Sequence, residues 1–542
     1  MEKMRKNLKK ILAAIGVLLV VLAGRLAYIQ IAGYPELSAA VRAQSMIALE
    51  GSNSRGIIYD RNGAPLVAGE SRYVYIIKEN EFDSDARKVL EQLNAEEVSA
   101  DNKGYYVYSS DHYDKACGER LIDDNRAYIL QASARYSDDQ VAEHLIGYVN
   151  KGDDSGAAGL ELMCDEQLSA LNRKVYAAAD VAGNILPGRG LIISSDDKSD
   201  SYITKGIRTT VDKELQQAVE AAVSRENNNC AAVVMAVDTG DILAMACTPG
   251  FDPDNVDDYL EAGDDELINK ATQGEYPPGS VFKIVVAAAA LEQGISPDKV
   301  FTCAGTSSAG GIEIGCETGG KEGHGDIRFE EAFAESCNSC FVQLGQQIGA
   351  DNIISMAEKM GLGRKTMNNY PQENEGHLMD EYERYGAGSG NLSIGQGETL
   401  VTPLQVAVMT NTVASGGIYR GANILMNDEK ESRQVISENT ADVIGKMMKA
   451  VSLYGTASSL DIKDEAGNAR AAVKTGTAEF GPEDENSSHG WITGYAPCDS
   501  PEYTITVFVE NGGSGSLSAG PVFTEILDYL EESGSYSRPT LA

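Results

Sequence analysis

Three short strings, met in order along the chain, contain the side chains that acyl transfer through a serine requires. They are Ser280-Val281-Phe282-Lys283, Ser336-Cys337-Asn338 and Lys474-Thr475-Gly476-Thr477. Together they offer a nucleophilic hydroxyl, a lysine base, a second hydroxyl that can relay a proton, and a cationic clamp for a carboxylate. The chain has only five histidines, and none has an obvious place beside Ser280. A serine–lysine arrangement is the known replacement for a histidine base.

The setting of Ser280 separates it from two other S-x-x-K matches, Ser195–Lys198 and Ser296–Lys299. Ser280 follows a Pro-Pro-Gly turn signal and precedes a long apolar run, which predicts a buried helix that begins at or near Ser280. Lys283 then lies about one helical turn away on the same face, and the helix N-terminus favours an oxyanion. The other two serines are predicted to lie in a polar linker and in a turn before Pro297.

The segments around these strings alternate between strand-like and helix-like patterns. We expect helices over 212–224, over most of 281–360, and over 404–412 and 522–530, with strands at 231–238, 242–246, 491–495 and 503–509. This order predicts an α+β fold, with a mainly antiparallel sheet and helices packed on its faces. We expect a hairpin at Asn62-Gly63 and short β-rich pieces with polar helical patches over 64–150. The polar stretch from Ser194 to Thr204 is the predicted domain boundary.

Composition narrows the range of partners. At 542 residues, with 42% hydrophobic and 23% charged residues, the chain is predicted to be globular and to hold two or more domains. The excess of 81 acidic over 45 basic residues gives a net charge of −36. That charge argues against nucleic acid or anionic lipid as a partner of the bulk of the chain, and it is explained by a solvated acidic surface.

The first residues oppose this acidic trend. Five basic residues within positions 3–10 precede an apolar stretch from Ile11 to Gly24, which continues less cleanly to Ile31. The stretch could be a cleaved signal peptide, but no A-x-A cleavage site follows it directly, so we expect an uncleaved signal anchor. Positive-inside orientation then predicts a single-pass protein of the cell membrane with everything after about residue 33 outside the cytoplasm.

The three strings, in this order, resemble the signature of class B penicillin-binding proteins, which are monofunctional peptidoglycan D,D-transpeptidases. Further matches to the family pattern are Arg55-Gly56, Asp60-Arg61-Asn62-Gly63, His144-Leu145-Ile146-Gly147-Tyr148-Val149, Gly156, Gly159-Leu160-Glu161, Gly240-Asp241-Ile242-Leu243-Ala244-Met245, Gly395-Gln396-Gly397-Glu398, Thr402-Pro403-Leu404-Gln405 and Trp491-Ile492-Thr493-Gly494-Tyr495-Ala496-Pro497. The short N-terminal part resembles the shorter Gram-positive members. The resemblance implies a cytoplasmic tail (1–10), a transmembrane signal anchor (11–32), a β-rich pedestal, dimerisation-like domain (33–200) and a transpeptidase domain of the penicillin-binding and serine β-lactamase fold (206–535).

The resemblance also implies a role for each residue of the strings. Ser280 attacks the carbonyl between two terminal D-alanines, Lys283 is its base, Ser336 relays a proton to the leaving D-alanine, and Asn338 orients the substrate amide and Lys283. The clamp for the terminal carboxylate is expected at Lys474, Thr475 and Thr477, while Gly476 leaves room for the substrate and the N–H groups of Ser280 and Thr477 form the oxyanion hole. A β-lactam would acylate Ser280 and stall there, and D,D-carboxypeptidase side activity is a possible accompaniment.

Other functions compete with this interpretation. A serine β-lactamase would need a base for hydrolysis, and no E-x-x-L-N string lies between Asn338 and Lys474. A β-lactam receptor would need a signalling domain, for which the ten residues before Ile11 leave no room, and a non-catalytic wall-synthesis scaffold would not need the intact strings. The implied partners are peptidoglycan stem peptides on a lipid-linked precursor, β-lactams, the membrane, and a glycan-polymerising membrane protein of the shape, division or sporulation type.

No cofactor is required for this chemistry, but one cluster suggests a metal. Cys303, Cys316, His324 and Cys337 lie within one glycine-rich loop and the start of the S-x-N helix. Three cysteines and one histidine are an accepted ligand set for structural Zn²⁺. A Cys303–Cys316 disulfide is equally natural outside the cytoplasm, and free thiols are the third alternative.

Overall fold

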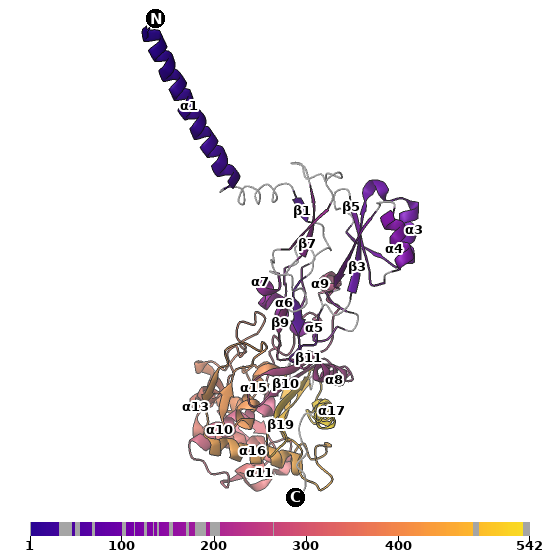
Figure 1. Ribbon diagram of the computed structural model, residues 1–542. Coiled ribbons are helices and arrows are strands. Elements are labelled where there is room, and N and C mark those ends of the chain that lie inside the picture. Colours follow the sequence, from indigo (N-terminus) through magenta and orange to yellow (C-terminus); the bar gives the residue numbers. More distant parts are fainter. Residues whose placement is uncertain are drawn as a thin grey trace. The chain divides into compact units, whose positions relative to one another are not determined.

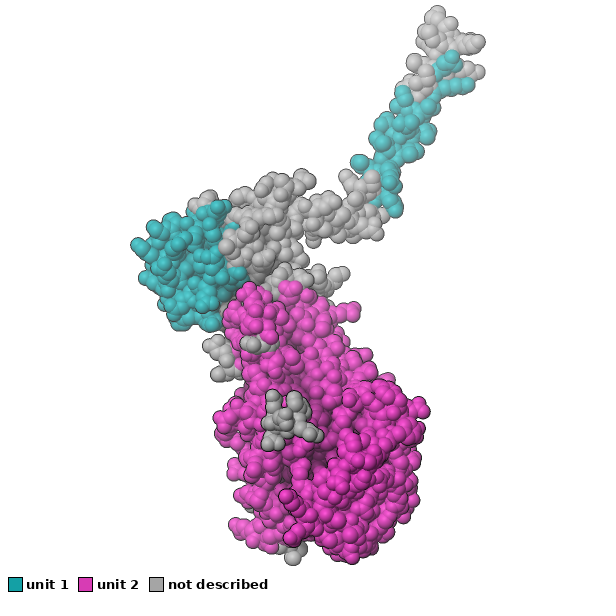
Figure 2. Space-filling view, turned by 180° about the vertical axis from the view of Figure 1, so that it is seen from behind, with its two compact units in different colours: residues 1–55, 70–134, 170–200 teal, residues 56–69, 135–169, 201–542 magenta. Residues whose placement is uncertain are grey.

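The computed structural model describes residues 2–31, 46–48, 55–67, 71–99, 105–112, 114–123, 127–133, 135–137, 140–150, 155–169, 173–178, 191–195, 206–263, 265–480 and 487–534. The chain divides into two compact units, each built from segments that are separate in the sequence (Figure 2). Unit 1 comprises residues 1–55, 70–134 and 170–200, and unit 2 comprises residues 56–69, 135–169 and 201–542.

Unit 1 contains an N-terminal helix, α1 (Glu2–Ile31), and two antiparallel sheets. One sheet has the order β1-β7-β8 and the other β4-β5-β3-β6. The strands are β1 (Met46–Ala48), β3 (Ser71–Lys78), β4 (Glu96–Ser99), β5 (Tyr105–Ser110), β6 (Ala127–Ser133), β7 (Arg173–Ala178) and β8 (Leu191–Ser195). The unit also has a 3-10 turn, η1 (Glu79–Glu81), and two helices, α3 (Ser84–Gln92) and α4 (Lys115–Asp123). Among the described residues, no helix combines the length and the apolar character that crossing a membrane requires.

The centre of unit 2 is a five-stranded antiparallel sheet with the order β11-β10-β20-β19-β18. Its strands are β10 (Cys230–Ala236), β11 (Ile242–Cys247), β18 (Ala472–Glu479), β19 (Ser488–Ala496) and β20 (Tyr503–Val509). β10 and β11 are apolar and almost wholly buried on both faces, which explains why their sequences are continuous apolar runs rather than alternating ones. β20 is also buried, and its Thr504 and Thr506 hydroxyls form hydrogen bonds with Asn411 Oδ1 and Thr493 Oγ1. β18 lies at one edge of the sheet and carries Lys474.

Helices cover both faces of this sheet (Figure 1). α8 (Lys213–Val223) and α17 (Ala519–Glu532) pack on one face, and α15 (Pro403–Ala414) and α16 (Glu438–Leu453) pack on the other. The further helices are α5 (Glu143–Ile146), α6 (Gly159–Met163), α7 (Asp165–Ser169), α9 (Val256–Ala262), α10 (Lys283–Glu292), α11 (Phe329–Ala334), α12 (Asn338–Ile348), α13 (Ala350–Lys359) and α14 (Ala387–Ser393), with 3-10 turns η3 (Gly279–Phe282), η4 (Gly320–Glu322) and η5 (Glu381–Glu383).

Short strand pairs complete unit 2. They join β2 (Ile57–Tyr59) to β9 (Gly206–Arg208), β12 (Val300–Cys303) to β15 (Gly325–Arg328), β13 (Thr306–Ala309) to β14 (Ile312–Gly315), and β16 (Ile418–Arg420) to β17 (Ser432–Gln434). Helices dominate residues 281–360 as expected, but β12 to β15 interrupt them between α10 and α11. β13 and β14 form a hairpin, and β12 and β15, which flank this hairpin in the sequence, pair with each other. Their Thr, Ser and Gly residues serve turn geometry and strand pairing rather than apolar periodicity.

Most of the expected elements are confirmed within two or three residues, and the predicted α+β arrangement of an antiparallel sheet flanked by helices is confirmed in unit 2. Asn62-Gly63 forms the expected turn, in which Asp60 Oδ1 accepts from Asn62 N at 2.8 Å. Ser296 lies in a turn, as predicted, with Lys299 N donating to its carbonyl at 3.1 Å. Ser195 is the last residue of β8, while Lys198 and most of the predicted boundary stretch fall outside the described residues.

Candidate active site

Ser280 lies on a 3-10 turn that joins the Pro-Pro-Gly segment to α10. The turn depends on Gly279, whose φ of +53° is a conformation that glycine adopts without strain. A Cβ on Gly279 would lie 2.5 Å from the Thr477 carbonyl oxygen, so the turn packs directly against β18. Gly279 N also donates to Gly395 O at 2.8 Å. The predicted helix therefore begins with a tight turn, which leaves Ser280 partly exposed and holds it beside the edge strand.

The three strings converge on the side chain of Ser336. Lys283 Nζ donates to Ser336 Oγ at 3.2 Å, and Lys474 Nζ donates to the same oxygen at 3.0 Å. Lys283 Nζ also donates to Ser336 O and to Asn338 Oδ1, each at 2.7 Å. Residues from three distant parts of the sequence thus form one hydrogen-bonded cluster, which can pass a proton between two amines through a hydroxyl.

Ser336 itself has an unusual backbone conformation. Its φ is +53°, a left-handed value that costs a non-glycine residue about 1–3 kcal/mol. The residue forms the turn between α11 and α12, where Ser336 N donates to Phe333 O and Cys337 N donates to Ala332 O. This turn points the Ser336 side chain at the two lysines and leaves Asn338 as the first residue of α12.

Both lysines are completely buried, and burial disfavours their charged forms. Burial lowers the pKa of Lys283 to about 8. Burial, followed by repulsion from Lys283, lowers the pKa of Lys474 well below its ordinary value. Burial is therefore the cause that lowers the pKa of Lys283, and the repulsion between the two amines acts on Lys474. A lysine with a pKa near 8 can be unprotonated at neutral pH often enough to act as a base.

The rest of the third string lies on β18 beside this cluster. Thr475 Oγ1 forms a hydrogen bond with Thr456 Oγ1 at 2.5 Å, and Thr477 is partly exposed. The position of Gly476 differs from the expectation that it leaves room for substrate. A Cβ on Gly476 would lie 3.1 Å from both Trp491 Cβ and Val281 Cγ1, on the side where β18 packs against the Ser280 turn. Gly476 therefore permits this internal packing.

The four predicted metal ligands come together as a group. The ligand atoms of Cys303, Cys316, His324 and Cys337 all lie within 4.8 Å of one another. Cys316 Sγ is 3.6 Å from both Cys337 Sγ and His324 Nδ1, close to the spacing of about 3.8 Å for sulfurs around tetrahedral Zn²⁺. The three cysteines are buried and are not joined by disulfides. The donor set and its spacing fit a Zn²⁺ ion.

Two further residues near the site were missed by the sequence analysis. Cys340 Sγ lies 3.3 Å from Cys337 Sγ, one turn along α12, and the C-x-x-C spacing was a signal that could have found it. After Cys337 and Cys316, Glu317 is the next group whose negative charge raises the pKa of Lys283 against the effect of burial. No sequence motif marks Glu317, because only the fold of the loop after β14 brings it near Lys283.

Comparison with known proteins identifies the family. The model of the penicillin binding protein transpeptidase domain matches residues 230–528, which contain the three strings and all five strands of the central sheet. The chain is 31% identical over 361 residues to the peptidoglycan D,D-transpeptidase PbpA of Mycobacterium tuberculosis, covering 59% of this chain and 72% of the relative. It is 26% identical over 601 residues to the peptidoglycan D,D-transpeptidase MrdA of Salmonella typhimurium, covering 96% of each.

Solved structures show the same fold at lower identity. A complex between penicillin-binding protein PBP2 and MreC from Helicobacter pylori superposes with a TM-score of 0.68 at 23% identity, covering 91% of this chain and 99% of the other. A chain of a peptidoglycan synthase complex that coordinates polymerization and crosslinking gives 0.72 at 22% identity, covering 99% and 100%. The chain belongs to the penicillin-binding protein transpeptidase family. Within it, the chain is a class B member, as the resemblance implied.

Proposed function

We propose that Ser280, Lys283, Ser336, Asn338 and Lys474 carry out the reaction of this family, in which a serine-type D,D-transpeptidase cross-links peptidoglycan stem peptides. The family and the reaction class are those of the relatives. The assignment of residues rests on one observation: Ser336 Oγ accepts hydrogen bonds from Lys283 and Lys474 at once. A hydroxyl between two buried amines is a proton relay whose two ends can exchange roles.

In the acylation step, Ser280 Oγ attacks the carbonyl carbon of the penultimate D-alanine, and its proton passes to the neutral Nζ of Lys283. The N–H groups of Ser280 and Thr477 stabilise the oxyanion, which the close packing of Gly279 on Thr477 supports. The C–N bond then breaks, and the departing D-alanine amine takes a proton through Ser336 Oγ. The product is an ester on Ser280. Lys474, Thr475 and Thr477 hold the terminal carboxylate.

In the second step, the amine of another stem peptide attacks this ester. The amine loses a proton to the lysine pair, the C–O bond breaks, and Ser280 recovers its proton as the new peptide bond is completed. A β-lactam ring imitates the first substrate, but its amine stays attached after ring opening. The acyl-enzyme then persists, since the leaving group blocks the approach of an acceptor.

Labelling with a fluorescent penicillin tests this assignment. We expect a persistent adduct on the wild-type protein, complete loss of the adduct in Ser280→Ala, and an unchanged adduct in Ser296→Ala. Ser296 is a matched control, because it also stands in an S-x-x-K string but lies in an exposed turn. An adduct that hydrolyses within minutes would indicate a β-lactamase, and no adduct on the wild type would indicate a non-catalytic scaffold.

We also propose that Cys303, Cys316, His324 and Cys337 hold a structural Zn²⁺ ion. The support is the fit of three buried sulfurs and one imidazole nitrogen to tetrahedral coordination. The ion would link the glycine-rich loop that carries Cys303, Cys316 and His324 to the start of α12. It would take no part in the acyl-transfer chemistry. Through Cys337, which lies between Ser336 and Asn338, it would hold the turn that carries both of these residues.

The membrane anchor and the assembly of this protein are further proposals. We propose that the basic and then apolar N-terminus forms a signal anchor, with the catalytic unit outside the cytoplasm. The same wall-synthesis reaction needs newly polymerised glycan, so we propose a glycan-polymerising membrane partner; the peptidoglycan synthase complex that shares the fold supports this. The full chain should sediment with membranes after an alkaline wash, while a chain starting at residue 33 should not. Recovery of both forms in the soluble fraction would contradict the anchor.

A further inference from the structure

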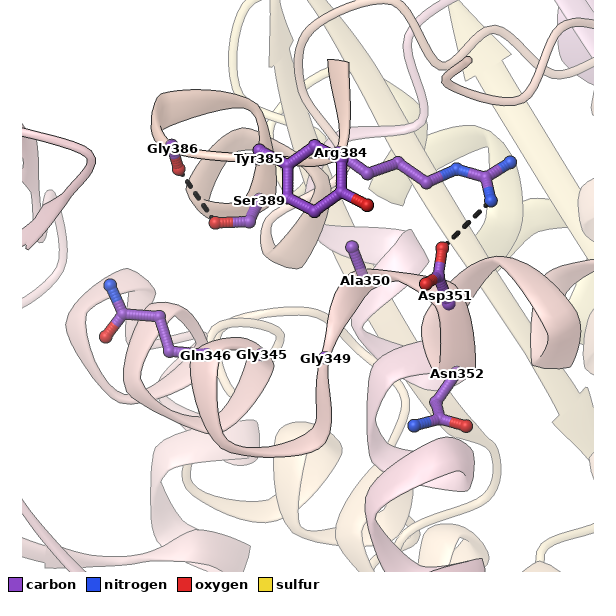
Figure 3. A pocket seen from close by; sticks show the side chains of 10 residues that line it. All are labelled: Gly345, Gln346, Gly349, Ala350, Asp351, Asn352, Arg384, Tyr385, Gly386 and Ser389. Atoms are coloured by element: carbon purple, nitrogen blue, oxygen red, sulfur yellow. Dashed lines mark hydrogen bonds and ion pairs between the residues drawn. The ribbon is translucent and has the colours of Figure 1, made fainter. Parts of the chain in front are cut away.

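A pocket with a volume of about 350 Å³ lies at the corner where α12 ends and α13 begins, facing the first turn of α14. Figure 3 shows Tyr385 and Arg384 on one wall, with Gln346 and Asn352 across the pocket from them. Side chains that can form hydrogen bonds line it: Gln346, Asp351, Asn352, Arg384, Tyr385 and Ser389. Glycines form much of the remaining wall. None of these residues belongs to the cluster around Ser336.

The charges in this pocket are matched within its own lining. Arg384 Nη1 donates to Asp351 Oδ1 at 3.0 Å, and Arg384 Nε donates to Met379 O at 3.0 Å. The other polar groups are two neutral amides, a serine hydroxyl and a phenol. Gln346, Asn352 and Ser389 each donate one hydrogen bond within the protein, so the pocket offers their oxygens, the remaining amide hydrogens and the phenol without a net charge. This arrangement suits a neutral ligand that carries many hydrogen-bonding groups.

Tyr385 adds an aromatic surface. Tyr385 is 69% exposed, and an exposed aromatic ring gains free energy when an apolar surface covers it. A ligand with one apolar face and a polar rim would satisfy both the ring and the amides. A pyranose ring with an acetamido substituent has this character, and one such ring fits the volume.

The pocket is connected to the active site by one hairpin. At the open end of β13–β14, Asn338 Nδ2 donates to Gly315 O at 3.1 Å. Near the pocket, Gln346 Nε2 donates to Ser308 O at 2.8 Å, and Gly310 at the hairpin tip packs against Gly386. Two of the four residues of β13 and three of the four residues of β14 are exposed. The hairpin therefore provides a surface track alongside α12, from the Lys283–Asn338 pair to the rim of the pocket.

The length of this track matches the substrate. Asn338 begins α12, and Gln346 in the pocket lining follows it by eight residues, which correspond to about 12 Å of helix. Four residues of extended peptide, the length of a stem from its sugar to the scissile bond, span at most about 14 Å. A sugar in the pocket would thus allow its own stem peptide to reach Asn338, and the Lys283 amine that donates to it, along the hairpin.

We infer that this pocket binds an N-acetylhexosamine residue of the glycan strand that bears the reacting stem peptide. The inference rests on the proposed transpeptidase function and adds a glycan subsite to it. It makes the enzyme prefer stem peptides on polymerised glycan to the same peptides without sugar.

The experiment compares two substrates on three variants. The substrates are uncross-linked glycan strands with pentapeptide stems and a sugar-free thioester analogue of the same stem. For Tyr385→Ala, and for Ala350→Trp, which fills the pocket, we expect kcat/KM on glycan strands to fall about tenfold, equivalent to about 1.4 kcal/mol. In both variants, the turnover of the thioester and the rate of penicillin acylation should stay within twofold of the wild-type values. Tyr382→Ala, an exposed tyrosine outside the pocket lining, should change none of these rates.

A peptide-free tetrasaccharide of alternating N-acetylglucosamine and N-acetylmuramic acid provides a direct binding probe. It should inhibit wild-type cross-linking of glycan strands and should not slow penicillin acylation. The inference is overturned if both pocket variants process glycan strands at the wild-type rate, or if they lose glycan and thioester turnover equally. Failure of the wild type to form any penicillin adduct would instead reject the proposed function itself.

Discussion

Lys283 Nζ donates a hydrogen bond to Asn338 Oδ1 at 2.7 Å, and this bond ties the base of the reaction to the first residue of α12. The other end of the same amide donates to Gly315 O at 3.1 Å. Asn338 therefore joins the α10 lysine to the loop that carries Cys316. Because the amide is neutral, it positions the lysine without stabilising its charged form as a carboxylate would.

This arrangement predicts the pH dependence of acylation. Lys283 must be unprotonated to accept the Ser280 proton, and burial places its pKa at about 8. The rate constant for penicillin acylation should therefore rise as the pH rises through about 8 and level off above it. Asn338→Asp should raise this midpoint by about one unit or more, since a nearby carboxylate favours the protonated lysine. Stopped-flow acylation between pH 6 and 10 measures both curves, and a midpoint that stays the same in Asn338→Asp would contradict the assignment.

The conformation of Ser336 allows its hydroxyl and its backbone to be tested separately. Ser336→Ala removes the relay and keeps the left-handed φ, whereas Ser336→Gly removes the relay and relieves the strain. Both variants should lose acylation rate by roughly 10²–10⁴-fold, the usual effect of removing a positioned proton-transfer group. Ser336→Gly should be more stable to urea than Ser336→Ala by about 1 kcal/mol. A Ser336→Gly protein that acylates at the wild-type rate would rule out the relay.

The close packing around Gly476 predicts that a side chain at this position lowers both the stability and the acylation rate. The Cβ of Gly476→Ala would lie 3.1 Å from Val281 Cγ1 and 3.3 Å from Pro278 O, so β18 and the Ser280 turn must separate slightly. We expect a loss of about 1–3 kcal/mol in the free energy of unfolding, together with slower acylation. Adding Val281→Ala should restore part of the free energy of unfolding and part of the acylation rate, because it removes one of the crowded atoms. If the double variant shows simple additivity in a thermodynamic cycle, the two positions do not interact.

The sequence was sufficient for the chemistry of the site but not for its geometry. The three strings, the helix after Ser280 and the buried strands β10 and β20 could be predicted, because each depends on local composition and periodicity. Two features could not be predicted: the left-handed φ of Ser336, and the direction in which a side chain at Gly476 would point. Both follow from how the S-x-N turn and β18 pack against other elements.

The same distinction applies to the residues that lie away from the strings. Cys303, Cys316, His324 and Cys337 could be grouped from their types, but only the pairing of β12 with β15 and the position of α12 bring their ligand atoms within 4.8 Å. The pocket beside Tyr385 has no sequence signature at all. Its walls come from segments about 30 residues apart that meet only after α12, α13 and α14 have packed.

The cysteine cluster predicts that loss of the metal slows acylation indirectly, through the loop and the turn that the ion would hold. Protein purified without chelators should contain about one equivalent of zinc, whereas Cys316→Ser should contain less than a few tenths, because three ligands hold Zn²⁺ poorly against competing water. Cys498→Ser should keep its zinc, since this half-buried cysteine lies outside the cluster. We expect Cys316→Ser to acylate roughly 10–100-fold more slowly, because Gly315, the hydrogen-bond partner of Asn338, precedes Cys316 directly. Less than a few tenths of an equivalent in the wild type, measured by elemental analysis, would reject the metal and leave free thiols or a disulfide as the alternatives.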